Sequence, residues 1–218
     1  MAQGDYTRKM TEKKREIWKG FFVLEGMDGS GTTTQLELCR TRAQQEKLTL
    51  DCEAEPTTGA IGTLLRRFLR RELEGTSQTL AWLFAADRQE HLFAGAGIQH
   101  RLTEGRKILT DRYWFSSMAY QSLDLPWDQV WSLQASFPLP EAIFFLDVDT
   151  ETAAARRDQR ALAEELFEKA TLQERIRAGY HLVWEQLKRE SPEAEIILID
   201  GRKPKTEIHE EIWDRLCR

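Results

Sequence analysis

Short apolar runs alternate with longer amphipathic stretches along this chain. The clearest run covers residues 21–24, where every position is apolar, as in a central parallel strand that helices cover on both faces. Further strand candidates lie at 48–54, 107–110, 142–146 and 196–199, of which the first is weak. Helical stretches lie between them, at about 35–45, 60–74, 78–103, 114–123, 127–136, 151–163, 169–190 and 205–217. This alternation predicts an α/β fold with a parallel sheet and helices on both of its faces.

The predicted sheet belongs to a single domain at residues 21–218. A chain of 218 residues suits one α/β domain and is long enough to bury a core without stapling by disulfides or metals. Residues 1–20 precede the domain as a polar extension rich in lysine and arginine, which we expect to be loose or partly helical.

Composition and net charge limit the classes of partner that this domain is expected to bind. Hydrophobic residues make up 41% and charged residues 31%, which is ordinary for a soluble globular protein. The formal net charge of -5 indicates no overall attraction to nucleic acid, although a local cationic pocket stays open. No apolar run approaches the roughly 20 residues of a membrane span, and the N-terminus lacks the apolar core of a signal peptide. We therefore expect a cytoplasmic protein without nucleic-acid or membrane partners.

Cysteine and histidine positions point to no further chemistry. The cysteines are far apart and odd in number, so their spacing predicts reduced thiols and neither a metal site nor a disulfide framework. They are Cys39, Cys52 and Cys217. The histidines have no nucleophile or base partner visible by spacing, and we assign them no role. They are His91, His100, His181 and His209.

A glycine-rich segment directly after the first strand predicts a phosphate-binding loop. Residues 26–33 match G-x-x-x-x-G-K-[ST] except at Thr32, which replaces the lysine. The glycines let successive backbone N–H groups turn toward one anion, the next helix adds its dipole, and Thr33 offers a hydroxyl to Mg²⁺. The alternative is a glycine-rich turn that binds nothing. The predicted nucleotide-binding residues are Gly26, Met27, Asp28, Gly29, Ser30, Gly31, Thr32, Thr33 and Thr34.

The missing lysine bears on catalysis. That lysine normally brings positive charge to the transferred phosphoryl group, and loss of one well-placed donor costs on the order of 10²–10³ in rate. A mobile arginine contributes roughly 10³–10⁵, so an arginine elsewhere in the chain could offset the loss. The opposing interpretation is a chain that binds nucleotide but has lost catalysis.

Several segments together resemble thymidylate kinases, a family of P-loop nucleoside-monophosphate kinases, from about residue 21 to the end of the chain. These segments are 22–29 with 33–35, 55–62, 83–88 with His91, 111–113 with 116–121, and 144–149. The resemblance implies a three-layer P-loop NTPase fold with a five-stranded parallel sheet and a short lid at about 153–168. It also implies transfer of the ATP γ-phosphoryl group to dTMP, giving dTDP and ADP, with Mg²⁺ as cofactor and a homodimer as the assembly.

Phe84 and Arg88 are the candidate base-binding pair. They lie four residues apart on a predicted helix and share a face, which suits a flat base that is both stacked and hydrogen-bonded. The resemblance implies that Phe84 stacks on thymine and that Arg88 contacts its carbonyl. The alternative is core packing for Phe84 and a surface ion pair of Arg88 with Asp87 or Glu90.

The remaining acceptor contacts come from other segments. Arg112 follows a strand end, so its fork can reach a monophosphate in a bidentate manner, and the resemblance gives it that role. The resemblance also places further groups around the acceptor and the metal. Ser117 and Tyr120 approach the base and sugar, Asp28 accepts from the sugar 3′-hydroxyl and orients Mg²⁺, Glu55 lines the cleft, and Asp111 is an outer-shell metal ligand.

The chain departs from the family pattern around these residues. Ala54 replaces an arginine, Thr57 and Thr58 replace glycines, and Ser117 replaces an asparagine that many members carry. These changes affect mainly the contacts to phosphate. Arg66 could substitute for the missing arginine, or it could belong to a solvated helix face.

The lid supplies the candidate cations for the donor. Some members carry an arginine in the phosphate loop and others carry basic residues in the lid; Gly29 stands at the first of these places, so the chain resembles the second group. Arg156 and Arg160 lie one turn apart if the segment is helical, and we expect them to neutralise the bridging and leaving oxygens. The alternative is an exposed charged helix. The predicted catalytic residues are Asp28, Arg112, Arg156 and Arg160.

Two other functions stay open at this point. The acceptor could be another nucleoside monophosphate or a deoxynucleoside, although the Phe84–Arg88 pair favours a pyrimidine. The chain could also be a nucleotide-binding protein without phosphotransfer, which Thr32 supports. The presence of acceptor-site residues counts against this last interpretation.

Overall fold

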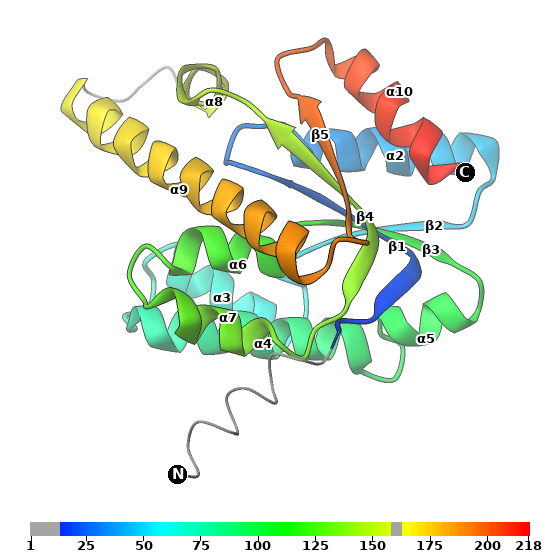
Figure 1. The fold of residues 1–218 in the computed structure, drawn as a ribbon, viewed down its shortest axis with the longest axis horizontal. Helices are drawn as coiled ribbons and strands as arrows, with labels where there is room; N and C mark the ends of the chain where they lie inside the picture. Colours follow the sequence, from blue (N-terminus) through cyan, green and yellow to red (C-terminus); the bar gives the residue numbers. More distant parts are fainter. Residues whose placement is uncertain (1–13, 158–162) are drawn as a thin grey trace.

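A five-stranded, all-parallel sheet forms the centre of the protein (Figure 1). The computed structural model describes residues 14–157 and 163–218. The strand order is β2-β3-β1-β4-β5. The strands are β1 Ile17–Gly26, β2 Leu50–Ala54, β3 Lys107–Asp111, β4 Leu139–Asp147 and β5 Glu195–Asp200. Because all strands run the same way, their carboxyl ends meet at one edge, where Leu24 pairs with Asp111 and Gly26 with Leu146.

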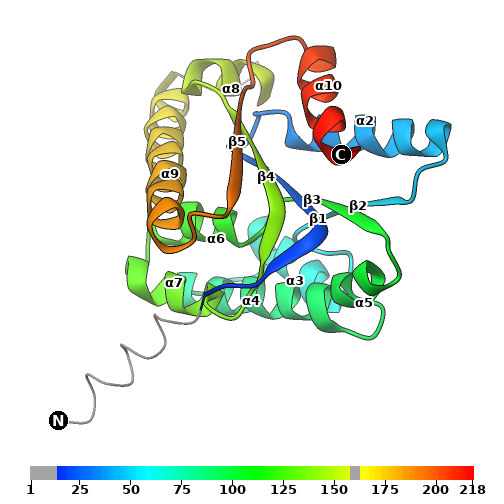
Figure 2. The same cartoon turned by 45° about the vertical axis from the view of Figure 1, so that its right-hand side comes forward.

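Helices cover both faces of the sheet, which confirms the predicted three-layer α/β fold (Figure 2). Alternate residues of β1 point to opposite sides: Phe21 and Val23 enter one core cluster, and Phe22 and Leu24 enter the other. Helices α2 Thr32–Glu46 and α10 Lys205–Leu216 cover one face. On the other face lie α4 Ser77–Phe93, α5 Ile98–Thr103, α6 Trp114–Gln121, α7 Trp127–Gln134 and α9 Ala163–Glu190. The remaining helices are α3 Ala60–Leu69, which packs on α4, and α8 Thr150–Arg157.

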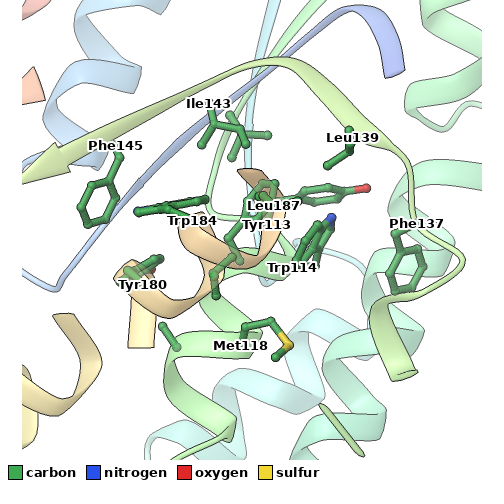
Figure 3. Close-up of a cluster of buried hydrophobic side chains, with 14 of the residues drawn as sticks. Tyr113, Trp114, Met118, Phe137, Leu139, Ile143, Phe145, Tyr180, Trp184 and Leu187 are labelled. Atoms are coloured by element: carbon green, nitrogen blue, oxygen red, sulfur yellow. The ribbon is translucent and has the colours of Figure 1, made fainter. Parts of the chain in front are cut away.

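An aromatic core fills the space between β4 and the helices α6 and α9 (Figure 3). The rings of Trp114 and Phe115 lie 4.0 Å apart between centroids, and Tyr180 stacks on Trp184 at 5.9 Å. Large buried rings hold their neighbours in place because they combine a large contact area with few rotatable bonds. This core therefore gives a firm base to α6 and α9, whose side chains reach the carboxyl edge of the sheet.

The first strand begins earlier than the sequence pattern predicted. Residues 17–20, which the prediction assigned to the polar extension, belong to β1. The strand contains an irregularity between Trp18 and Phe22, and Gly20 has a φ of +80°, which interrupts the apolar alternation there. A bulge hides this part of the strand from a pattern-based prediction.

The predicted helix at 78–103 is two helices, α4 and α5. The chain turns between them, where the Gly97 N–H donates to the carbonyl oxygen of Ala94 at 2.7 Å. A side chain at Gly97 would meet the carbonyl oxygen of Leu92 at 2.7 Å and that of Ala94 at 2.8 Å, so only glycine fits this turn. Likewise, the helix predicted at 60–74 ends at Leu69, and Arg71 has a left-handed φ of 60°. None of the described helices is long and apolar enough to cross a membrane.

Candidate active site

The phosphate loop connects the end of β1 to the start of α2. Gly29 and Gly31 have φ values of 90° and 104°, which side chains rarely allow, and the Ser30 N–H closes a turn on the carbonyl oxygen of Met27 at 3.0 Å. A side chain at Gly26 would collide with Ser30 and with the carbonyl oxygen of Leu146. The first amides of α2 have no partner within their own helix, so the loop and helix form an anion-binding cradle.

A cation from another element lies over this loop. Thr32 is buried at the position where related loops carry lysine. Arg156, at the end of α8, donates to the carbonyl oxygen of Gly201 at 3.0 Å and, more weakly, to that of Ser30 at 3.4 Å. Its exposed guanidinium therefore stands at the cradle. Arg160 lies outside the described residues.

Oxygen atoms gather beside the cradle at the end of β3. The Thr33 hydroxyl donates to one carboxylate oxygen of Asp111 at 2.6 Å. The other oxygen, Oδ1, is buried without a hydrogen bond, and the nearest cation, Arg112 Nε, lies 4.0 Å from it. Hard oxygen donors of this kind fit Mg²⁺. No three His, Cys, Asp or Glu side chains within the described ranges cluster to hold a metal by themselves.

Arg112 joins the phosphate loop to a neighbouring cavity. Its left-handed backbone, with φ at 77°, turns the side chain back toward the loop. Nη1 donates to the carbonyl oxygen of Gly26 and to the Tyr180 hydroxyl at 2.8 Å, and Nη2 donates to Asp28 at 2.9 Å. The guanidinium carbon also lies 5.7 Å from the ring centroid of Tyr120. The fork is thus held in place beside both the cradle and the cavity.

The cavity has a volume of about 390 Å³ and opens beside the phosphate loop. Several separate parts of the chain line it: the loop, the segment after β2, the end of α3, helix α4, and helix α6 with the turns before and after it. The wall contains every residue that the sequence predicted for the acceptor, namely Asp28, Glu55, Phe84, Arg88, Arg112, Ser117 and Tyr120. Its size suits one small ligand, and its wall combines apolar side chains with a few polar groups, as ligand sites commonly do.

Arg88 is buried at the floor of this cavity and is only 1% exposed. Its Nε donates to Glu55 at 2.9 Å, Nη1 donates to the Gln134 side-chain oxygen at 2.7 Å, and Nη2 lies 3.2 Å from the Ser117 hydroxyl. The partner of Arg88 is therefore Glu55, and not Asp87 or Glu90 as the alternative proposed. A buried arginine with a carboxylate and two neutral partners is held in one orientation.

The segment after β2 is fastened by side chains that sequence reasoning did not connect. Asp87 accepts from the Thr57 N–H at 2.7 Å and from its hydroxyl at 2.6 Å. Arg66 is half-buried and donates to the carbonyl oxygens of Pro56 and Thr57, so it does not lie on a fully solvated helix face. A side chain at Gly62 would strike the Thr57 carbonyl. Thr57, which stands in place of a glycine, thus anchors the loop.

Comparison with known proteins agrees with this geometry. The thymidylate kinase profile matches residues 24–212. A relative from Treponema pallidum (strain Nichols), whose name assigns it to the thymidylate kinases, is 39% identical over 200 residues, which cover 92% of this chain and 96% of the relative. The thymidylate kinase of Leptospira borgpetersenii serovar Hardjo-bovis (strain L550) is 34% identical over 201 residues, which cover 91% of this chain and 93% of the relative. The chain belongs to the thymidylate kinase family.

Glu25 is a site residue of this family member to which sequence reasoning assigned no role. It is fully buried behind Arg112 and accepts hydrogen bonds from the Tyr113 N–H, the Ser116 hydroxyl and the Tyr180 hydroxyl at 2.9, 2.6 and 2.8 Å. Burial raises its pKa to about 7, although these donors and Arg112 oppose the shift. An acid at the end of a buried apolar strand was the signal for Glu25 in the sequence; nothing there pointed to Gln134.

This pKa predicts a pH-dependent stability. The pKa of Glu25 is about 7 in the folded state, above the ordinary 4.5, so the folded state holds the proton more tightly than the unfolded chain does. The stabilisation that the protonated Glu25 carboxyl contributes is therefore complete below pH 4.5 and is lost as the pH rises through 7. Between pH 5 and 8, the free energy of unfolding of the wild type should fall by roughly 2–3 kcal/mol relative to that of Glu25→Gln. Urea unfolding of both proteins at the two pH values measures this difference. Parallel pH profiles would contradict the prediction.

Proposed function

We propose that this protein is a thymidylate kinase, which transfers the γ-phosphoryl group of ATP to dTMP and releases dTDP and ADP. One observation carries the proposal: Arg112 contacts the phosphate loop at Gly26 and Asp28 and also lines the cavity that contains Phe84 and Arg88. Phosphoryl transfer between two nucleotides needs two binding sites that meet at their phosphates. The family membership of the chain supports the same reaction.

The cavity is the proposed dTMP site. Phe84 would stack on thymine, and Arg88 would donate to its carbonyl oxygen, with Ser117 beside it. Tyr120 and Asp28 would face the sugar, and Asp28 would accept from its 3′-hydroxyl. Arg112 would bind the acceptor phosphate with its fork. Glu55 lies behind Arg88 and holds it, so Glu55 contributes through orientation.

The cradle is the proposed ATP site. The amides of residues 26–34 would bind the donor phosphates, and Thr33 and Asp111 would hold Mg²⁺ directly or through water. Mg²⁺ would neutralise charge on the β- and γ-phosphates. Arg156 and, outside the described residues, Arg160 would form part of a lid at about 153–168. In this arrangement Arg156 supplies the positive charge that Thr32 does not.

Catalysis in this site rests on positioning and charge. An oxygen of the dTMP phosphate attacks the γ-phosphorus of ATP, and the bond from that phosphorus to the β,γ-bridging oxygen breaks. The attacking oxygen is already anionic, so no general base is required. Arg112 would hold the acceptor phosphate in line, and Arg156 would stabilise the charge that builds up on the leaving oxygen. A closed lid would keep water away from the γ-phosphate.

A coupled assay of ADP release, run with a panel of nucleoside monophosphates and with thymidine, tests this function. We expect turnover with dTMP and at least a tenfold preference for it over CMP, AMP and GMP. Turnover with a different acceptor would establish the alternative substrate. Binding of ATP with no turnover of any acceptor would establish a nucleotide-binding homologue that has lost catalysis.

We also propose a cytoplasmic homodimer. Trp82 on α4 is 58% exposed and Leu69 on α3 is 52% exposed, and these neighbouring helices offer an apolar surface for a second copy. The thiols of Cys39, Cys52 and Cys217 are free, which suits a reducing compartment. The molar mass from light scattering tests the assembly.

A further inference from the structure

Three acids alternate along the edge strand β2 and its continuation. Asp51, Glu53 and Glu55 are two residues apart, so they occupy one side of the extended chain. Each of these acids forms an ion pair with an arginine from outside the strand. Arg106 and Arg101 contact Asp51, Arg101 contacts Glu53, and Arg88 contacts Glu55 at 2.7 Å. The result is a chain of ion pairs that runs from the surface to the floor of the cavity.

His91 is the link between the last two acids. Its Nε2 lies 2.7 Å from Glu53, and its Nδ1 lies 3.2 Å from Glu55. Carboxylate oxygens only accept hydrogen bonds, so both ring nitrogens must carry protons for both contacts to form. A ring protonated on both nitrogens is an imidazolium. Burial by itself would lower the pKa of His91, but the two carboxylates outweigh burial and raise it to about 9.

The two oxygens of Glu55 are divided between two cations. Oε1 faces His91, and Oε2 faces Arg88. The carboxylate is 3% exposed, so water does not compete for it, and its plane is set by these contacts. Because one cation holds each oxygen, the carboxylate cannot rotate without losing a charged hydrogen bond. His91 therefore limits the positions that the Arg88 guanidinium can take.

We propose that His91 is a positioning residue for acceptor recognition: clamped between Glu53 and Glu55, it holds the Glu55 carboxylate so that Arg88 meets the base of the nucleotide in the cavity. The inference rests on the proposed function, because it takes the cavity to be the site of dTMP. His91 does not touch the phosphate loop in the contacts of the described residues. Its effect is thus confined to the acceptor.

Two variants on different helices test the clamp. His91→Gln keeps one N–H donor but removes the charge, and His100→Gln changes an exposed histidine of α5 whose Nε2 lies 3.5 Å from Glu104. Hydrogen bonds to charged groups are strong, so we expect His91→Gln to raise the KM and Kd for dTMP about 10- to 100-fold. The KM for ATP and the kcat should change by less than about threefold by the same reasoning. His100→Gln should behave as the wild type.

The outcomes separate positioning from general damage. Unchanged dTMP affinity in His91→Gln, or an equal loss of affinity for dTMP and ATP, overturns the proposal. His91→Lys keeps a positive charge and should recover part of the dTMP affinity.

A measurement on the wild type alone covers the case in which the variants fail to fold or dTMP is not the acceptor. In ¹⁵N spectra at pH 7.5, both ring nitrogens of His91 should show the shifts of an imidazolium. A neutral His91 overturns the clamp whatever the acceptor is, whereas absent dTMP turnover with a protonated His91 overturns only the proposed function.

Discussion

Replacing Arg112 with asparagine is expected to lower dTMP turnover by about 10³–10⁵-fold, the range that an arginine at a transferring phosphoryl group supplies. Arg112 hydrogen-bonds to the phosphate loop and also lines the cavity. It is the only positively charged side chain among the described residues for which both hold. Asparagine is chosen because it tolerates the left-handed backbone that Arg112 adopts, with φ at 77°. The ADP-release assay under saturating ATP measures the loss.

A matched control exists for this substitution. Arg71 also has a left-handed backbone, with φ at 60°, but it is exposed and absent from the cavity wall. Arg71→Asn should retain wild-type turnover and stability. If Arg112→Asn keeps more than about a tenth of the wild-type turnover while folding normally, Arg112 does not hold the acceptor phosphate for the transfer, because a tenfold loss corresponds to only about 1.4 kcal/mol.

Replacing Arg156 with alanine is expected to reduce kcat on the order of 10²–10³-fold, the cost of losing one preorganised donor to a developing charge. The affinity for dTMP should stay the same, since Arg156 contacts the carbonyl oxygens of Ser30 and Gly201 and no part of the cavity wall. Stopped-flow single-turnover rates, together with calorimetric dTMP binding, separate the two effects. Arg175→Ala, an exposed arginine of α9, is the control.

A second variant asks whether Arg156 takes the place of the missing lysine. Thr32→Lys would put an ammonium at the position that related loops use. Combined with Arg156→Ala, it should regain at least about tenfold of the lost kcat, or roughly 1.4 kcal/mol of transition-state stabilisation. Unchanged turnover in Arg156→Ala alone would show that the positive charge comes from elsewhere.

The sequence by itself determined the architecture and the glycine-rich loop after the first strand. Apolar runs predicted the strands because a parallel strand is buried on both faces, and the glycine spacing at 26–33 predicted the cradle because its backbone angles exclude side chains. The residues predicted for the acceptor, through their resemblance to a family, all line one cavity in the fold. The phosphate loop could be predicted from the residues themselves because it lies within one short segment.

Only the tertiary structure decided what those residues contact. Arg88 meets Glu55 and Gln134 across 33 and 46 residues of chain, and His91 finds its two acids across 38 and 36 residues. No spacing rule connects such distant positions; the sheet order and the helix packing bring them together. Burial makes these contacts important for stability, because a buried charge costs free energy unless a partner of opposite charge compensates it. For this reason His91 had no role in the sequence and has two carboxylate partners in the fold.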